Sequence, residues 1–549
     1  MIDIRRHRLD AIKTFHFVLH SIALGVLALV LVSFIVPSIF ALLPVFMPSF
    51  AQSISGNSVM TFESFLKIAR ALRFTLTQAL LSAFIAALLG VPAAFLVSKR
   101  NFPFRRFLLA LSGVPLCVPP MIIALAFVLF YGRQGWLNTI LMRVFSLKEP
   151  PVTFLYSMAG VVIAHGFYNF PVVLRTVSRV WERLPESEEE AASLLGARPF
   201  RLFRTVTLPH LLSPIFSSSI LVFLYCFFSF IIVMLFGGIG GTTLEVELYR
   251  AARSSFNFRF AGFIALVETV SAFGILLLYV YVQRFFSSGS SGINPVRKRK
   301  NFSNWREILL SVIFLSGIAF FFVGPLMSVI VRSFQIQQRG AYSGKLEWSL
   351  TVWKNIFSRP SLYSAVISTV IVSSITAVTA TLAALAFALS QNRKSSFVSL
   401  IPFAPLAVSS VMLGFGWTLF IPQGSVFVLV CAESAIAWPF AWTQIRTALD
   451  RIPLGVNEAS LLLSRNGMDS NIRVRIPLVL PGILSGAALV FAISAGDATL
   501  PLVLSLGKFE NLPLMLYRLV GSYRFPEACA CAVILALLSG FVFFLQDIK

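Results

Sequence analysis

The feature that most constrains this chain is a series of long apolar segments. There are about a dozen, each some twenty residues long, which is enough to cross the hydrocarbon core of a bilayer, about 30 Å thick, as an α-helix. The 549-residue chain is 57% hydrophobic and 12% charged, with a mean hydropathy of +0.85, whereas soluble domains contain about 25% charged residues. A β-barrel requires alternation of apolar and polar residues over about ten residues, and these runs are continuous. The sequence therefore predicts an all-α polytopic membrane protein.

The apolar segments predict about twelve spanning helices, at residues 16–43, 73–98, 107–131, 154–178, 211–236, 259–284, 307–331, 362–390, 397–420, 425–447, 478–505 and 527–545. The first is too long for a typical signal peptide and is expected to remain attached. With a cytoplasmic N-terminus, the loops richest in Lys and Arg fall on the inner side, as is usual for membrane proteins. This bias accounts for the formal net charge of +23 without a nucleic-acid partner and puts both termini in the cytoplasm.

A charged motif divides the chain into two similar halves. Glu190-Ala191-Ala192 and, further on, Leu208-Pro209 return 268 positions later as Glu458-Ala459-Ser460 and Ile476-Pro477. Between the halves lies a Gly- and Ser-rich segment with a basic tail, a composition typical of a flexible linker. We therefore predict a first half at residues 1–284, a cytoplasmic basic linker at 285–306 and a second half at 307–549. Repeats in the same orientation predict a pseudo-two-fold axis along the membrane normal, with a pathway between the halves.

The first copy of the motif has the pattern of a short helix-turn-helix. Ser187 and Glu190 have the spacing of a capping box that begins a helix. Ala191, Ala192 and Leu195 would supply a compact helical face. Gly196 is suited to end this helix and Pro199 to begin the next. An ordinary capped loop has the same features, but a second copy in the matching position favours a functional role.

The spacing Glu-Ala-Ala-x3-Gly-x9-hydrophobic-x-Leu-Pro resembles the signature loop of permease subunits of bacterial binding-protein-dependent ABC importers. The resemblance spans nearly the whole chain and implies a type I importer fold with two six-helix halves in the cytoplasmic (inner) membrane. It also implies a homodimeric cytoplasmic ATPase, which binds ATP and Mg and receives the short helix after the glycine, and a periplasmic substrate-binding protein. The implied coupling residues are Glu190, Ala191, Ala192, Gly196, Arg198, Leu208, Pro209, Glu458, Ala459, Ser464, Gly467, Ile476 and Pro477.

The second copy departs from the family pattern. Ser460 replaces the third-position Ala and Ser464 replaces the Gly, while Asn466-Gly467 offers a turn three residues later. On this basis the second short helix is expected to be displaced by nearly one turn, about 5 Å of rise. The two docking sites would then be unequal.

The fusion of both halves in one chain is similar to a minority of these permeases, chiefly importers of ferric iron and thiamine. Three segments resemble the thiamine permeases: Tyr131 to Trp136, Ala164 to Pro171, and Leu516-Tyr517 with Gly521 to Arg524. This resemblance implies transport of thiamine or its phosphate esters, with ferric iron as the alternative. Arg133, Gln134 and Trp136 are candidates for docking the binding protein, although a helix-end anchor in the interfacial aromatic belt would have the same pattern.

Several polar residues fall within the predicted spans. His165, Tyr168 and Asn169 share one helix face and should turn toward protein or a water-filled path, and hydrogen bonds between helices would explain them equally well. An ionised carboxylate at mid-depth costs about 3 kcal/mol, so Glu268, Glu433 and Asp497 need partners or water. Because thiamine is a cation, Glu433 and Asp497 are candidates for the translocation pathway, with structural pairing as the alternative.

Enzymatic chemistry is not expected in this chain. It contains no Gly-x4-Gly-Lys-Ser/Thr phosphate loop, so ATP hydrolysis is assigned to a separate subunit. The five cysteines lie in apolar segments without metal-ligand spacing, and no cofactor is predicted. A secondary transporter is the alternative from another class; it would lack the coupling loops and depend on an ion gradient.

Overall fold

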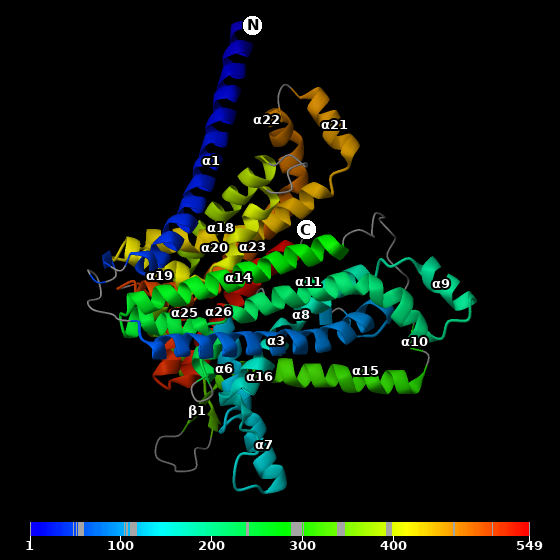
Figure 1. Cartoon of the computed structure of the whole chain (residues 1–549), viewed down its shortest axis with the longest axis vertical. Helices are drawn as coiled ribbons and strands as arrows, with labels where there is room; N and C mark the ends of the chain where they lie inside the picture. Colours follow the sequence, from blue (N-terminus) through cyan, green and yellow to red (C-terminus); the bar gives the residue numbers. More distant parts are fainter. Residues whose placement is uncertain are drawn as a thin grey trace. The chain divides into compact units, whose positions relative to one another are not determined.

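The computed structural model describes residues 2–47, 49–50, 52, 60–103, 105, 108–109, 118–237, 241–286, 299, 301–302, 304–337, 346–390, 398–464, 467–507 and 509–547. Cys117, Asn466 and most of the predicted linker lie outside these residues. The described part of the chain is almost entirely helical, as predicted (Figure 1). Its two short strands, β1 (Gln335–Gln337) and β2 (Leu346–Trp348), pair antiparallel with Gln335 opposite Trp348.

The first part of the chain forms α1 (Ile2–Phe46), α3 (Phe62–Lys99), α6 (Pro120–Tyr131), α7 (Trp136–Phe145), η1 (Phe154–Tyr156), α8 (Met158–Trp181), α9 (Glu186–Leu194), α10 (Pro199–Leu202), η2 (Phe203–Thr207), α11 (Leu208–Phe227), α12 (Ile231–Phe236), α13 (Leu244–Tyr249), η3 (Arg250–Ser254) and α14 (Phe258–Phe286). The remainder forms α15 (Trp305–Ile318), η5 (Ala319–Val323), α16 (Gly324–Arg332), α17 (Thr351–Phe357), α18 (Pro360–Ser390), η6 (Val398–Ala407), α19 (Ser410–Phe420), α20 (Val426–Asp450), α21 (Leu454–Leu463), α22 (Gly467–Ser470), η7 (Asn471–Arg475), α23 (Ile476–Gly496), α24 (Thr499–Leu504), α25 (Leu512–Gly521) and α26 (Phe525–Asp547).

Ten helical segments among the described residues are long and apolar enough to cross a membrane. A bent pair, Ile401–Ala407 with Ser410–Phe420 at 89°, makes eleven if it is counted as one span. The predicted span 154–178 corresponds to α8, which has 24 residues but a lower hydropathy because it carries His165, Asn169 and Arg175. The chain is therefore a multi-pass membrane protein.

The helices form two compact units. Unit 1 comprises Met1–Ile54, Phe357–Arg518 and Ile534–Lys549, and unit 2 comprises Ser55–Ile356 and Leu519–Val533. Each unit combines most of one predicted half with the first helix of the other half. The predicted division at residues 285–306 concerns the duplication itself and stays a prediction.

Close packing of α3, α8 and α11 forms the centre of unit 2. Two glycines allow the approach of α3 to α8: a Cβ at Gly90 would lie 2.6 Å from the Cβ of Val173, and one at Gly166 would lie 2.4 Å from Ile85 Cγ2. Helix α14 packs on α11 and on α13. Small residues at such contacts are what membrane helices use to approach one another.

The segment α15–η5–α16 joins unit 2 through aromatic contacts. Phe320 lies edge-on to Phe130 at 5.4 Å, Phe321 stacks on Phe167 at 5.2 Å, and Phe322 meets Phe170 edge-on at 6.0 Å, all between ring centroids. Helix α16 also packs on α6. This segment follows the predicted linker in sequence but packs on helices of the first half.

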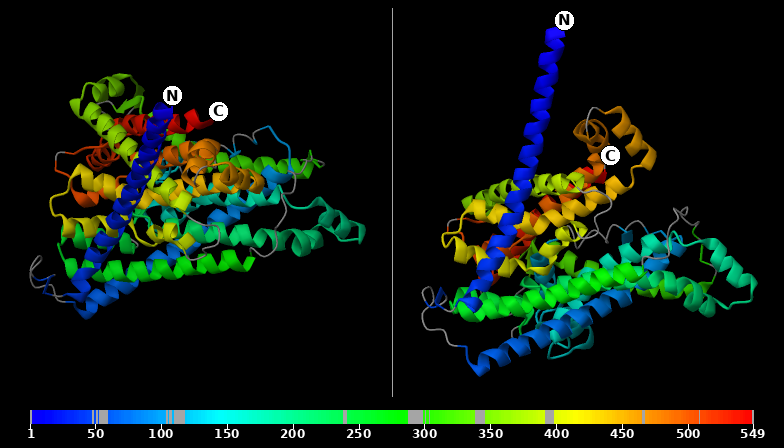
Figure 2. Two further views of the ribbon diagram at one scale, coloured as in Figure 1. Left: turned by 90° about the horizontal axis from the view of Figure 1, so that it is seen from above. Right: turned by 45° about the horizontal axis from the view of Figure 1, so that its top comes forward.

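Unit 1 is built from α1, α18, α19, α20 and α23 (Figure 2). Helix α1 packs along α18, α19 and α20, and the carbonyl of Pro37 approaches Gly416 so closely that a Cβ there would lie 1.8 Å from it. Trp438 of α20 is fully buried and meets Phe387 of α18 edge-on at 5.5 Å. The first helix of the chain is thus an integral part of the packing of the second half.

Candidate functional site

The first charged element lies where α8 ends and α11 begins. Helix α9 ends in a turn in which Gly196 has φ +78°. The Ala197 amide donates to the Ala192 carbonyl and the Gly196 amide to the Ser193 carbonyl, both at 3.0 Å, which is the Schellman arrangement. Pro199 then begins α10, as predicted. Gly196 is therefore the helix stop that the sequence indicates.

This element is braced against the rest of unit 2. The Glu189 carboxylate accepts from Lys99 Nζ at 2.9 Å and from Thr207 Oγ1 at 3.1 Å. Phe203 of the π-helix η2 stacks on Trp181 at 6.3 Å, and Trp181 contacts Phe95 at 5.6 Å. Since η2 continues directly into α11, a displacement of α10 is transmitted to a spanning helix without an intervening loop.

The predicted capping box is wrong. The N-cap of α9 is Pro185, no side chain caps the helix, and Ser187 lies inside its first turn. The helix begins at Glu186, one residue before Ser187 and two residues before the start that a Ser187 cap would give. Glu188, in that first turn, instead pairs with His210 at 2.9 Å.

The second element has the same layout 268 positions later. Helix α22 and the π-helix η7 coincide in register with α10 and η2, and α23 begins at Ile476, the equivalent of Leu208. The predicted displacement of about one turn is therefore wrong. Ser464, in place of Gly196, ends α21 in an extended conformation with φ −87°, which a residue with a Cβ adopts easily. The chain thus leaves α21 by another conformation and still starts α22 at the matching residue.

Different chemistry makes the equivalent brace in the second element. Asn457 and Arg475 occupy the positions of Glu189 and Thr207, and Arg475 Nε donates to Asn457 Oδ1 at 2.9 Å. A further hydrogen bond joins Ser460 to Ser470 at 2.8 Å, and Ser464 Oγ donates to the Ser460 carbonyl. The Ser460 that replaces alanine therefore ties α21 to α22.

Exposed leucines mark the tips of both elements. Leu194 and Leu195 are each 89% exposed, and the equivalent Leu462 and Leu463 are 85% and 87% exposed. Leu195 therefore does not contribute to a compact helical face, contrary to the prediction. Leu194, Leu462 and Leu463 were not predicted, although two adjacent leucines in a charged segment, repeated at the same spacing, would have indicated them.

The remaining predicted coupling residues lie along the two elements and at the starts of α11 and α23. Glu190, Ala191, Glu458 and Ala459 are exposed, Ala192 is half-buried, and Arg198 is exposed at the start of α10. Leu208-Pro209 and Ile476-Pro477 begin α11 and α23, and Gly467 begins α22. Each element therefore presents an apolar pair next to an exposed carboxylate.

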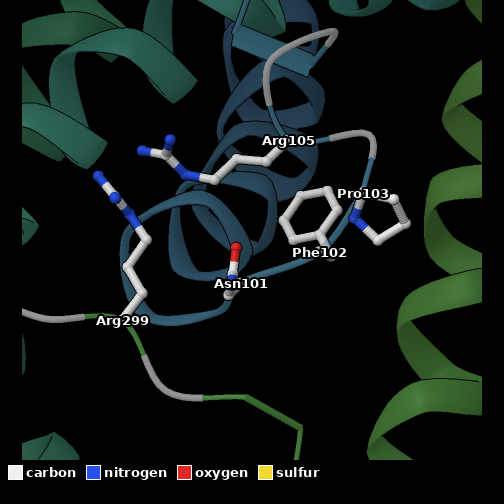
Figure 3. A pocket seen from close by; sticks show the side chains of 5 residues that line it. All are labelled: Asn101, Phe102, Pro103, Arg105 and Arg299. Atoms are coloured by element: carbon white, nitrogen blue, oxygen red, sulfur yellow. The ribbon is translucent and has the colours of Figure 1, made fainter.

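A basic pocket lies beside the first element, at the end of α3. It has a volume of about 630 Å³ and is lined by Asn101, Phe102, Pro103, Arg105 and Arg299. Figure 3 shows both guanidinium groups pointing away from Phe102 and Pro103. Arg105 and Arg299 both pair with Glu182, at 2.8 and 3.1 Å. Arg299, which belongs to the predicted linker, is therefore held at the end of α8.

The predicted docking loop is a tight connection between α6 and α7. Gly135 donates to the Gly132 carbonyl at 2.8 Å, and a Cβ at Gly132 would lie 2.3 Å from the Val128 carbonyl oxygen. Buried Asn138 donates to the carbonyls of Gly132 and Val152. Arg133 and Gln134 are exposed and Trp136 is half-buried, so the loop presents two polar side chains on a rigid turn.

His165, Tyr168 and Asn169 all belong to unit 2, and His165 and Asn169 are buried there. His165 is buried, with Nδ1 3.0 Å from Gln78 Oε1 and Nε2 2.7 Å from Ser229 Oγ. Asn169 donates to the His165 carbonyl, and the Tyr168 hydroxyl donates to the Val118 carbonyl at 3.1 Å. These side chains join α3, α8 and the segment after α11, as interhelical hydrogen bonds do.

The acidic candidates of the second half lie in unit 1. Glu433 of α20 is 3% exposed, and its Oε2 accepts from Thr376 Oγ1 at 3.1 Å and from Ser494 Oγ. Asp497 accepts from the amides of Thr499 and Leu500, at 2.8 and 3.2 Å. The Asp497 carboxylate therefore caps the start of α24.

The spanning helices, together with a duplicated, braced and exposed element, define a polytopic α-helical transport protein. Residues 86–291 match the family described as "Binding-protein-dependent transport system inner membrane component". A putative 2-aminoethylphosphonate transport system permease protein of Salmonella typhi is 33% identical over 235 residues, which cover 42% of this chain and 81% of that relative. The chain belongs to this family of inner-membrane transport components.

Relatives that match over a greater length are thiamine transport system permease proteins. The one from Escherichia coli (strain K12) is 26% identical, over 86% of this chain and 87% of the relative. The one from Brucella abortus (strain 2308) is 27% identical, over 88% of this chain and 87% of the relative. The similarity therefore includes both halves of the chain.

Proposed function

We propose that this chain is the fused permease of an ABC importer for thiamine or its phosphate esters. The observation that carries the proposal is the pair of elements α9–α10 and α21–α22, which match in register and expose two leucines each. Contiguous exposed apolar side chains in a charged segment are typical of a binding surface. Their partner is a separate, homodimeric cytoplasmic ATPase that binds ATP and Mg, so this chain is not itself an enzyme.

The substrate follows from the relatives and from the three similar segments. The thiamine permeases align over more than four-fifths of the chain, whereas the phosphonate relative aligns over 42%. A periplasmic binding protein would deliver the substrate to the rigid turn that carries Arg133, Gln134 and Trp136. In this orientation both termini and both elements face the cytoplasm.

The mechanism rests on mechanical continuity from each element to a spanning helix. Closure of the ATPase dimer displaces α10 and α22, and the braces Glu189–Thr207 and Asn457–Arg475 carry the displacement into α11 and α23. The state that the closed ATPase binds more tightly becomes the populated one, which is alternating access driven by differential binding. His165, Tyr168, Asn169, Glu433 and Asp497 stay candidates for the pathway, and the hydrogen bonds of His165 and Asn169 support a role in holding helices together.

Reconstitution tests the proposal. The permease, the ATPase and the binding protein encoded with it are incorporated in proteoliposomes, and uptake of thiamine, thiamine pyrophosphate and ferric iron is measured with internal ATP. We expect ATP-dependent uptake of thiamine or its pyrophosphate. Uptake of ferric iron instead would refute the substrate, and uptake that persists without the ATPase but stops when a proton gradient is dissipated would refute the class of transporter.

A further inference from the structure

The two halves carry polar clusters at equivalent positions. Glu433 lies 268 positions after His165, Ser494 after Cys226, and Asp497 after Ser229. A backbone contact supports the equivalence: the Leu244 amide donates to Thr75 Oγ1 at 3.0 Å, and the Leu512 amide, 268 positions later, donates to Thr369 Oγ1 at 2.9 Å. The same framework therefore surrounds His165 in unit 2 and Glu433 in unit 1.

In the first-half cluster the histidine ring is fully hydrogen-bonded. Both ring nitrogens of His165 have partners, Gln78 and Ser229, and Gln78 Nε2 donates to the Cys226 carbonyl at 2.8 Å. Asn169 donates to the His165 carbonyl and to Cys226 Sγ. The hydrogen-bonding capacity of the histidine ring is therefore used in joining helices.

In the second-half cluster one oxygen of the Glu433 carboxylate accepts no hydrogen bond from any residue that the structure describes. Both hydroxyl donors of the cluster, Thr376 and Ser494, bond the same oxygen, Oε2 of Glu433. Oε1 is buried and accepts no hydrogen bond within the part of the chain that the structure describes. Ser373 bonds Ser494, and Asp497 is engaged with the amides of α24. Oε1 of the Glu433 carboxylate is therefore available to a partner from outside this cluster.

We propose that Glu433 Oε1 binds the cationic part of the imported substrate, an interaction that the equivalent His165 does not make. The inference rests on the proposed function and deepens it, because it assigns substrate binding to the second half. A carboxylate attracts a cation more strongly in a buried site than in water, because the effective dielectric constant is lower there. The two hydroxyls that bond Oε2 hold the carboxylate in place and so fix the direction of Oε1.

The test compares Glu433→Gln with Glu433→Asp and with Glu268→Gln in reconstituted transporter. Glu268 is the matched control because it is also a buried carboxylate, 1% exposed, in the membrane helix α14 of unit 2. Thiamine and an uncharged analogue, in which a thiophene replaces the charged thiazolium ring, are each presented on saturated binding protein. Uptake, ATP hydrolysis and the amount of assembled complex are measured.

We expect wild-type protein and Glu268→Gln to take up thiamine at least tenfold faster than the neutral analogue. Glu433→Gln should assemble and hydrolyse ATP normally but lose this preference, and Glu433→Asp should keep part of it. Unchanged uptake by Glu433→Gln, or an equal fall for both compounds, would assign Glu433 a structural role and overturn the inference. If the wild-type complex does not take up thiamine, that result alone overturns the proposed function and the inference that rests on it.

Discussion

The shape of the proposed docking element α9–α10 depends on the backbone conformation of one residue, Gly196. Its φ of +78° is a left-handed conformation that costs an L-residue about 1–2 kcal/mol. A Cβ there would meet nothing within 4 Å, so Gly196→Ala changes the backbone preference without a steric clash. If the ATPase binds only the formed turn, 1–2 kcal/mol corresponds to an affinity about 5- to 30-fold weaker.

The assay is the dissociation constant of the ATPase from the permease in lipid nanodiscs. Gly196→Asn should weaken binding less than Gly196→Ala, because Asn adopts the left-handed conformation more readily. Gly455→Ala is the matched control: this glycine lies in α21, has no positive φ and has open space at its Cβ position, and alanine favours a helix. Wild-type affinity for Gly196→Ala at normal expression would refute the argument that the turn must be formed for docking.

Two further predictions concern the leucine tips and the α3–α8 contact. Leu194→Asp and Leu462→Asp should each reduce recovery of the ATPase with the purified permease, because both tips would contact it; loss with one variant only would show that a single element docks. Gly166→Val should lower the melting temperature of the purified protein, since overpacking costs about 1–3 kcal/mol and a Cβ would lie 2.4 Å from Ile85 Cγ2. Gly274→Val, with open space in α14, should not, and equal effects of the two would contradict the close contact.

The sequence predicted those features that depend on local chemistry and spacing. Gly196 ends a helix because only the left-handed conformation permits the two hydrogen bonds of that turn, and Pro199 begins the next helix for the reason expected. The capping box failed because Pro185 starts the helix before Ser187. The predicted displacement of α22 is wrong because Ser464 ends α21 in an extended conformation, so that the absence of a glycine does not move the start of α22.

The exchange of first helices between the two units could not be predicted from sequence. The part of α1 from Ala23 to Phe46 is apolar, and a membrane helix of this kind carries no stripe that identifies its neighbour. Its place beside α19 depends on the fit of Pro37 against Gly416, a contact between residues far apart in the chain. The hydrogen-bond partners of His165 and Glu433 could not be predicted for the same reason: each partner lies in another segment of the chain.

The two charged elements of this chain have the same geometry but different side-chain contacts. A homodimeric partner would impose this pattern on a fused permease. The two identical ATPase subunits of the proposed function would present identical clefts, so α10 and α22 would have to project equally even though their sequences have diverged. The four-residue helices and five-residue π-helices match in length, while the brace has changed from a carboxylate–hydroxyl pair to an amide–guanidinium pair. The polar clusters within the membrane do not face two identical partners. There the first half has His165, with both ring nitrogens hydrogen-bonded, and the second half has Glu433, with one oxygen that accepts no hydrogen bond within the described residues. Symmetry is therefore expected to be retained where the ATPase binds and lost where a single asymmetric substrate passes.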